Sequence, residues 1–249
     1  MSPVTPQQRR YLDAMGIDVW VRRDQVLPEA AAVAQAESAS IESALAPEPA
    51  VPLEAPGEGL PDVSELDWDG LRQRVAGCRL CELHQSRTQT VFGVGDQQAR
   101  WLIVGEAPGV DEDRQGEPFV GRAGKLLNAM LQAVGLSREQ VYIANILKCR
   151  PPNNRDPRPE EAACCFPYLR RQIELIQPDL IIAVGRIAAQ RLLDCNTPLN
   201  RLRGSVQQLE STATPVIVTY HPAYLLRSPA DKRKAWEDLL FARSLTTGE

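Results

Sequence analysis

Residues 100–113 read RWLIVGEAPGVDED, and they indicate the architecture of the folded part of the chain. The run WLIV (101–104) is short and apolar, which is typical of a strand buried on both faces of a parallel sheet. The loop GEAPGVDED (105–113) follows, with two glycines and a proline, as in many phosphate-binding loops. It also contains four carboxylates, at Glu106, Asp111, Glu112 and Asp113. These carboxylates would repel a phosphate, so the loop must face another chemical group.

Three more apolar runs have the same character, at residues 141–147, 179–185 and 215–220. Segments with helical spacing lie between and after them, at residues 121–136, 158–176, 185–194 and 229–245. Strands that alternate with helices predict an α/β protein, a three-layer α/β/α sandwich with a central four-stranded parallel sheet. In such a sheet the ligand crevice lies beyond the C-terminal ends of the strands. Polar, chemically competent loops follow these strands, which makes that edge the candidate site.

The chain has three parts that differ in composition. Residues 1–23 combine basic pairs with apolar side chains. We expect residues 7–23 to be amphipathic and either to bind a protein partner or to pack loosely on the body. Residues 24–65 are rich in Ala, Pro and Glu, which predicts a disordered acidic linker. The folded domain is expected over residues 66–249.

The charge is distributed unevenly along the chain. Residues 24–70 hold eleven acidic residues and no basic one, and residues 1–23 carry a net +2. Since the whole chain carries −4, residues 71–249 carry a net +5. A basic body suits a polyanionic partner, although charge alone favours an ordinary solvated surface. No window of about 18 apolar residues indicates a membrane span and no signal peptide is evident, so we expect a cytoplasmic protein.

Six cysteines should be reduced in the cytoplasm, where metal binding is commoner than a disulfide framework. Cys78 and Cys81 form a C-x2-C pair, Cys149 follows the second strand, and Cys165 lies in the next helix. Four such thiolates can hold Zn²⁺ or a [4Fe–4S] cluster, and the long second spacing suits the larger cluster. Cys164 and Cys195 are compatible with small buried apolar residues.

Three motifs resemble those of the family 4 uracil-DNA glycosylases, which are iron–sulfur members of the uracil-DNA glycosylase superfamily. They are GEAPGVDEDRQGEPFVGRAGKLL (105–127), NILKCRPPNNR (145–155) and HPAYLLR (221–227), within a resemblance that spans residues 70–245. The resemblance implies a DNA repair enzyme that flips uracil out of DNA and hydrolyses its N-glycosidic bond, leaving an abasic site.

The resemblance also implies a structural [4Fe–4S] cluster, no nucleotide cofactor, no catalytic divalent metal and a monomeric enzyme. The implied ligands are Cys78, Cys81, Cys149 and Cys165. We prefer Cys165 to Cys164, because the second Cys of EEAACCFPYL matches the family's position.

The implied base pocket contains Phe119, Asn145, His221 and Ala107. Phe119 matches the family's stacking aromatic, and stacking of a base on an aromatic ring is worth ~1–3 kcal/mol. The Asn145 amide offers a donor and an acceptor, which complement uracil O4 and N3–H but not cytosine. His221 can donate a hydrogen bond to uracil O2 as negative charge develops there, either as a neutral or as a charged ring.

The implied catalytic group is Glu106. Related superfamily members carry an Asp directly before the motif's proline, where this chain has Ala107. Glu112 is the second candidate, or it excludes the thymine methyl group. Asn154 is expected to help hold the water. The segment PAYLLR (222–227) is expected to be a loop that enters the minor groove. Its expected DNA contacts are a wedge at Leu225 or Leu226 and a phosphate contact at Arg227.

Other classes of function remain open at this stage. Glu106, Asp111 and Asp113 could hold Mg²⁺ in a phosphatase or nuclease. A noncatalytic Fe–S or zinc module that binds nucleic acid would explain the cysteines and the charge. A sister-family glycosylase would accept a broader range of deaminated bases.

Overall fold

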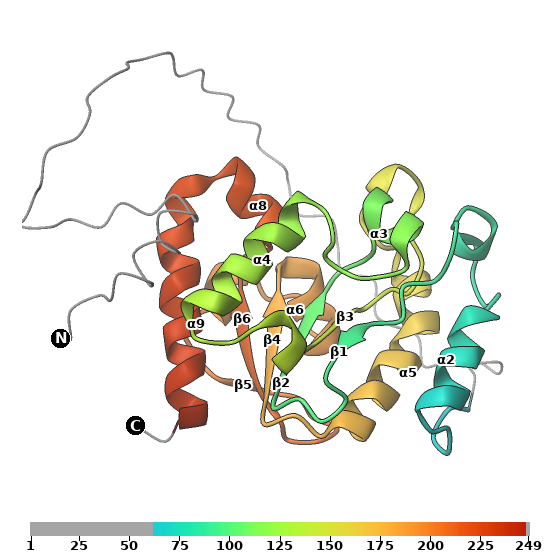
Figure 1. The fold of residues 1–249 in the computed structure, drawn as a ribbon, viewed down its shortest axis with the longest axis horizontal. Helices are drawn as coiled ribbons and strands as arrows, with labels where there is room; N and C mark the ends of the chain where they lie inside the picture. Colours follow the sequence, from blue (N-terminus) through green and yellow to red (C-terminus); the bar gives the residue numbers. More distant parts are fainter. Residues whose placement is uncertain (1–61, 248–249) are drawn as a thin grey trace, which may run out of the picture.

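Six strands form one mixed sheet at the centre of the molecule (Figure 1). The computed structural model describes residues 62–247. The strands are β1 (Val94–Gly95), β2 (Trp101–Gly105), β3 (Tyr142–Asn145), β4 (Leu180–Val184), β5 (Gln207–Gln208) and β6 (Pro215–Thr219). Their order is β1-β3-β2-β4-β6-β5, and the four inner strands are parallel. The predicted four-stranded parallel sheet is confirmed, and two short antiparallel strands extend its edges.

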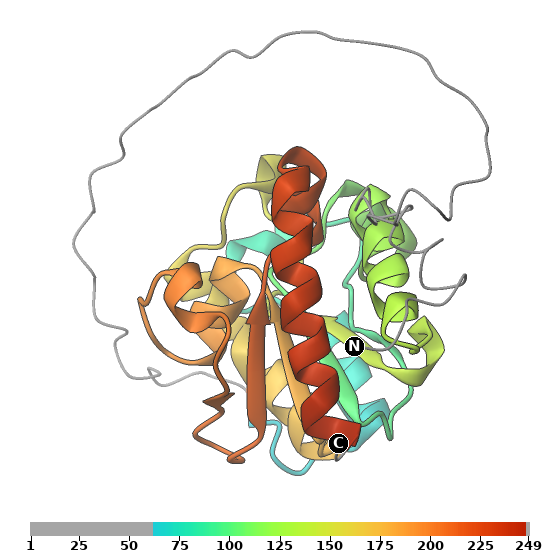
Figure 2. The ribbon, with the colours of Figure 1, turned by 90° about the vertical axis from the view of Figure 1, so that its left-hand side faces the viewer.

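Helices cover both faces of this sheet (Figures 1 and 2). The α-helices are α2 (Trp68–Ala76), α3 (Val110–Gln115), α4 (Arg122–Ala133), α5 (Pro159–Ile176), α6 (Arg186–Leu192), α7 (Leu199–Leu202), α8 (Pro222–Arg227) and α9 (Lys232–Thr247). Short 3₁₀ turns lie at η2 (Glu82–Gln85), η3 (Arg138–Gln140), η4 (Pro152–Asn154) and η5 (Pro229–Asp231). The four predicted helices correspond to α4, α5, α6 and α9.

Side chains that alternate between the two faces of each strand form two separate cores, one between the sheet and each helical layer. In β2, Leu102 and Val104 join the core that packs under α2, α5 and α6. Trp101 and Ile103 point the opposite way, into the core that packs under α4, α8 and α9. Both sets are buried, because side chains of a strand alternate between the two faces of the sheet. A central strand therefore has to be apolar at every position, as WLIV is.

The strand order places the end of β2 at a topological switch point. The chain leaves β2 through α4 to reach β3 on one side, and then crosses through α5 to β4 on the other side. Successive connections thus diverge from β2, and a crevice opens beyond its C-terminal end. The loop that begins at Gly105 lies in that crevice.

Residues 1–61, and with them the expected docking segment and most of the expected linker, lie outside the described residues. The folded domain reaches further back than residue 66, because Val63 is 5% exposed and belongs to the core under α2 and α5. Arg171 Nε also donates to the Leu66 carbonyl at 2.8 Å. Within residues 62–247, no helix is long and apolar enough to cross a membrane.

Candidate functional site

One pocket lies beyond the C-terminal ends of the parallel strands. It draws its lining from the loop after β2, from the ends of β3 and β6, and from η4. The lining includes Glu106, Ala107, Glu112, Phe119, Asn145, Asn154, His221 and Arg227. The structure thus brings together the predicted catalytic and base-binding residues, although they come from segments far apart in the sequence.

Phe119 lies beside His221, with ring centroids 5.6 Å apart and planes tilted by 30°. Its backbone has φ 54°, a left-handed conformation that is unfavourable for an aromatic residue. A side chain at Gly105 would overlap the Phe119 ring and Asn145 Oδ1, so only glycine fits at the end of β2. The strand end, the aromatic ring and the amide are therefore packed directly against one another.

Asn145 is 2% exposed, and its side-chain Oδ1 has no hydrogen-bond partner among the described residues. A buried amide oxygen without a partner costs free energy, about 1–3 kcal/mol, unless a ligand supplies the donor. Because Asn145 lines the pocket, a bound molecule with an N–H group can provide that partner.

The contacts of His221 favour a neutral ring and indicate its tautomer. Its Nδ1 accepts a hydrogen bond from the Ala223 backbone N–H at 3.1 Å, so the proton is on Nε2. Burial, reinforced by the positive charge of Arg227, lowers the pKa of His221 to about 4, and Glu112 opposes this shift. The structure therefore favours the neutral ring, which the sequence had left undecided, and Nε2–H remains as a donor.

Glu106 is a carboxylate of the β2 loop whose ionisation is altered by burial. Burial, reinforced by the negative charge of Asp156, raises the pKa of Glu106 to about 7, and Arg186 opposes the shift. A carboxylate with a pKa near neutrality is suited to accept a proton from water. Glu106 also lines the pocket with Asn154.

Glu112 has a different role, because both of its carboxylate oxygens are occupied by backbone donors. Oε2 accepts from Gly109 N at 3.1 Å, and Oε1 accepts from Val120 N at 3.0 Å and Gly121 N at 3.2 Å. Glu112 therefore fastens the start of α3 to the segment that presents Phe119. These contacts give Glu112 a positioning role in the fold, and the action of Glu106 on water stays a prediction.

Arg138 supports the same segment from the other side, and sequence reasoning missed it. Its guanidinium donates to the carbonyl oxygens of Phe119, at 3.2 Å, and Pro118. The left-handed turn at Phe119 is thus held from both sides. The Glu112 carboxylate accepts from the backbone N–H groups that follow Phe119, and Arg138 donates to the carbonyls of Pro118 and Phe119. No sequence pattern marks Arg138, because its partners lie about twenty positions away and are backbone atoms.

The other two acidic residues of the loop do not face the pocket. Asp111 forms an ion pair with Arg114 at 3.0 Å. Asp113 is 4% exposed, and its carboxylate accepts a hydrogen bond from Thr88 N at 2.9 Å. Since Glu106, Asp111 and Asp113 do not converge, the carboxylate–Mg²⁺ hypothesis lacks its ligand set.

Asn154 lies at the rim of the pocket in a left-handed conformation, with φ 52°. Its side-chain Oδ1 accepts from Arg150 Nε at 2.7 Å. This bond orients the amide so that its nitrogen stays available as a donor. The expected role in holding water stays a prediction.

The segment 222–227 was expected to be a loop, and this expectation is wrong. The segment forms the helix α8. Pro222 occupies its first turn, and His221 caps it by accepting from Ala223 N. Leu225 is 0% exposed and packs in the core under α4 and α9, so it cannot serve as a wedge without leaving that core. Leu226 is only partly buried and Arg227 is exposed, and they remain the candidate DNA contacts.

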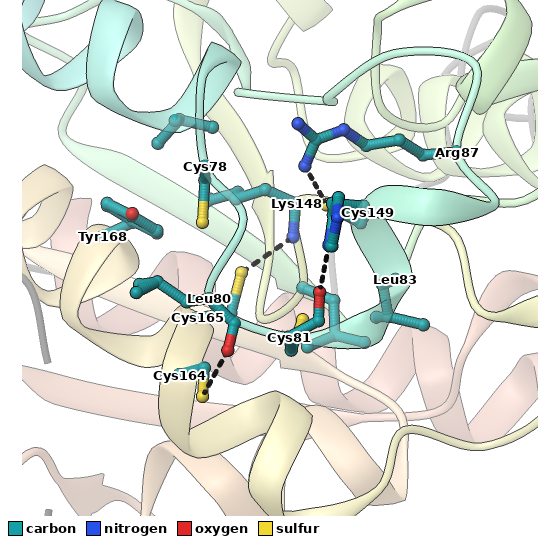
Figure 3. A pocket seen from close by; sticks show the side chains of 13 residues that line it. Cys78, Leu80, Cys81, Leu83, Arg87, Lys148, Cys149, Cys164, Cys165 and Tyr168 are labelled. Carbon is teal, nitrogen blue, oxygen red and sulfur yellow. Dashed lines mark hydrogen bonds between the residues drawn. The ribbon is translucent and has the colours of Figure 1, made fainter. Parts of the chain in front are cut away.

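Cysteines gather in a second pocket, between the C-terminal end of α2 and the crossover from β3 to α5 (Figure 3). Cys78, Cys81, Cys149, Cys164 and Cys165 line it, and Cys195 does not. Arg87 donates to Cys149 Sγ at 3.0 Å, and the Lys148 backbone N–H donates to Cys165 Sγ at 3.2 Å. Such donors stabilise sulfur that carries negative charge.

The geometry separates the two adjacent cysteines. Cys165 is 7% exposed and accepts a hydrogen bond as a cluster ligand does. Cys164 is less buried, and its thiol donates to the Leu80 carbonyl at 3.7 Å (Figure 3). Burial raises the pKa of Cys81 to about 11 and of Cys165 to about 12, so these thiolates need a compensating cation. Within residues 62–247, no three His, Cys, Asp or Glu side chains are placed to share a single metal ion.

Comparison with known proteins identifies the family of this chain. The uracil DNA glycosylase superfamily matches residues 92–240, and the chain belongs to that superfamily. Within it, the chain is 51% identical to the type-4 uracil-DNA glycosylase of Archaeoglobus fulgidus over 167 residues, which cover 65% of this chain and 84% of the relative. It is 45% identical to the type-4 enzyme of Thermotoga maritima, covering 71% and 93% of the two chains. The type-5 uracil-DNA glycosylase of Thermus thermophilus is 30% identical, with coverage of 51% and 73%.

Proposed function

We propose that this protein removes uracil from DNA by hydrolysing the bond between uracil N1 and deoxyribose C1′, which leaves an abasic site for repair. The observation that carries the proposal is the unpaired Asn145 Oδ1 in a pocket shared with Phe119 and His221. Uracil supplies the missing donor at N3–H, and cytosine does not. A site built around a buried amide rejects the wrong base by leaving polar groups unpaired.

The reaction separates charge, and the pocket holds one group for each sign. The departing uracil gathers negative charge, which the Nε2–H of a neutral His221 stabilises by donating to O2. The sugar becomes an oxocarbenium ion, which the Glu106 carboxylate attracts. Glu106 also takes a proton from the attacking water, whose oxygen bonds to C1′. The acidic loop after β2 therefore faces a group that becomes positive.

A single assay tests this function. The protein is incubated with a uracil-containing oligonucleotide in EDTA and then treated with alkali, which breaks the strand at abasic sites. We expect cleavage at the uracil position and none in the matched thymine oligonucleotide. An intact uracil strand would refute the proposal. Oligonucleotides with hypoxanthine or xanthine measure whether the range of bases extends beyond uracil.

We assign the cysteine-lined pocket to a [4Fe–4S] cluster held by Cys78, Cys81, Cys149 and Cys165. The donor set supports a cluster, because the four proposed ligands are among the five cysteines that line one pocket, and N–H groups donate to two of the sulfurs. When bound, the cluster supplies a structural cross-link and takes no part in hydrolysis. Lys148 and Arg87 place N–H donors beside two of the sulfurs, and a reducing cytoplasm would keep the cysteines from forming disulfides.

Replacing Cys164 and Cys165 one at a time distinguishes their roles. Cys165→Ala should abolish the visible iron–sulfur absorbance and the bound iron, because it removes a buried ligand. Cys164→Ala should retain both, since its thiol contacts a backbone carbonyl instead. Iron content and absorbance of the two purified variants are the measurement. A reversed pattern would assign the fourth ligand to Cys164.

The pH dependence of excision should follow Glu106. Because its pKa is raised to about 7, the carboxylate is protonated below neutrality and cannot accept a proton. The rate should fall by about tenfold per pH unit below that pKa. His221 cannot cause this limb, because its pKa is lowered to about 4. The measurement is a single-turnover pH–rate profile, and a limb near pH 4 alone would contradict the assignment.

Leu226 and Arg227 are the proposed DNA contacts, at the exposed end of α8 beside the pocket. A partly exposed leucine next to a base pocket can fill the gap left by a flipped nucleotide. Arg227 can pair with a phosphate, which makes binding dependent on salt. We propose that the enzyme acts as a monomer, because one chain provides every group named in this mechanism.

A further inference from the structure

Lys148 is a buried lysine that the proposed chemistry does not use. Its side chain is 1% exposed, and it sits three positions after Asn145 and one before Cys149. Its Nζ donates to the Asn145 carbonyl at 3.0 Å and to Gln172 Oε1 at 2.6 Å. Neither acceptor carries a charge. Within the described part of the chain, no carboxylate contacts this ammonium group.

A buried ammonium group needs a compensating negative charge, since isolated buried charges are strongly disfavoured. The cysteine-lined pocket lies alongside Lys148, which is part of its lining (Figure 3). The Lys148 backbone N–H donates to Cys165 Sγ at 3.2 Å, and Cys149 is its neighbour in the chain. Cys149 and Cys165 line the same pocket as Lys148, and they would supply that negative charge as the thiolates of a bound cluster.

The ammonium end of the Lys148 side chain contacts Asn145, which lines the proposed base pocket. The chain leaves β3 alongside the loop after β2, with Ile146 N donating to Gly105 O at 2.9 Å and Leu147 N donating to Glu106 O at 3.0 Å. Lys148 then folds back and fixes the carbonyl of Asn145. Gln172 completes this arrangement, because its Nε2 donates to Phe92 O at 3.0 Å and so fixes its own position.

We propose that Lys148 is a positioning residue that joins the cluster to base recognition. The cluster thiolates balance its charge, and its ammonium group holds the strand end from which the Asn145 amide reaches the base. This inference rests on the proposed uracil pocket and on the proposed cluster. It makes the cluster more than a cross-link, since its charge keeps a base-reading residue in place.

The test uses the intact, cluster-containing protein and two oligonucleotides. One carries 2′-fluoro-2′-deoxyuridine, whose glycosidic bond resists hydrolysis, and the other carries thymidine at the same position. Lys148→Met should weaken binding of the uracil oligonucleotide by about tenfold or more and leave binding of the thymine oligonucleotide unchanged. In the Asn145→Ala background, Lys148→Met should have no further effect on uracil binding. A lysine that merely stabilised the fold would weaken both oligonucleotides and add to the loss from Asn145→Ala.

Cluster retention is the second measurement. Lys148→Met should lose its visible absorbance faster than the wild type when an iron chelator is added, because a cation beside the thiolates has gone. Lys125→Met removes a positive charge from an exposed position on α4 and serves as the matched control. It should retain its cluster at the wild-type rate.

Each contrary result overturns the proposal. Unchanged uracil binding, a loss that adds to that of Asn145→Ala, or unchanged cluster retention would each exclude it. If Lys148→Met does not fold, Lys148→Gln serves in the same assays, because it keeps a donor but no charge. A wild-type protein that does not discriminate uracil from thymine would refute the proposed function itself, which separates the two failures.

Discussion

Glu106→Gln should lower the rate of uracil excision by about 10²–10⁴-fold, which is the contribution typical of a general base. Glutamine is similar in size to glutamate but accepts no proton from water and offers no charge to the oxocarbenium sugar. Binding should change little, because Phe119, Asn145 and His221 are the residues proposed to recognise the base. Single-turnover rates and the affinity for uncleaved substrate separate the two effects.

Asp111→Asn is the matched control for this prediction. Asp111 is a carboxylate of the same loop, but it pairs with Arg114 on the surface and is absent from the pocket lining. Its excision rate should stay close to that of the wild type. If Glu106→Gln turned over normally, or lost binding and rate equally, the assignment of Glu106 to the water would be wrong.

Asn145→Ala should lower uracil excision by about 10²-fold or more. The variant loses the buried donor and acceptor for uracil, and each hydrogen bond in such a site is worth ~1–3 kcal/mol. Discrimination against cytosine should fall at the same time, because the groups that would be left unpaired by cytosine are gone. Excision rates on uracil and cytosine oligonucleotides are the measurement.

The stability of Asn145→Ala provides an internal check. Since the wild-type Oδ1 is buried without a partner, removing it should not lower the free energy of unfolding by the usual cost of a lost hydrogen bond. A variant that is inactive and also strongly destabilised would indicate a structural Asn145. An active, selective variant would show that other groups read the base.

Much of this architecture could be predicted from the sequence, because buried parallel strands leave a clear signal. The runs around Ile103, Ile143, Ile182 and Ile217 are apolar at nearly every position, as strands covered on both faces must be. The helix α8 was missed for the opposite reason. It has only six residues, so it has no periodicity to detect, and its cap is the side chain of His221.

The supporting contacts of the site could not be predicted, because their partners are backbone atoms. Glu112 resembled a catalytic carboxylate until its three backbone donors were seen. Asp113 accepts a hydrogen bond from Thr88 N, 25 positions away, and no local sequence pattern reveals this contact. Lys148 follows directly on the apolar run 141–147, where a lysine is rare, and this is the one signal that the sequence offered.

The raised pKa of Glu106 links catalysis to thermodynamic stability. An unperturbed glutamate has a pKa of 4.5, and folding raises that of Glu106 to about 7, so the folded state binds the proton more tightly than the unfolded chain does. The resulting stabilisation is complete below the unfolded pKa and is lost as the pH rises through about 7. The ionised carboxylate that attracts the sugar is thus the form that opposes folding. Glu106→Gln should therefore raise the melting temperature more at pH 8 than at pH 5, and the proposed general base lowers the stability of the fold above neutral pH.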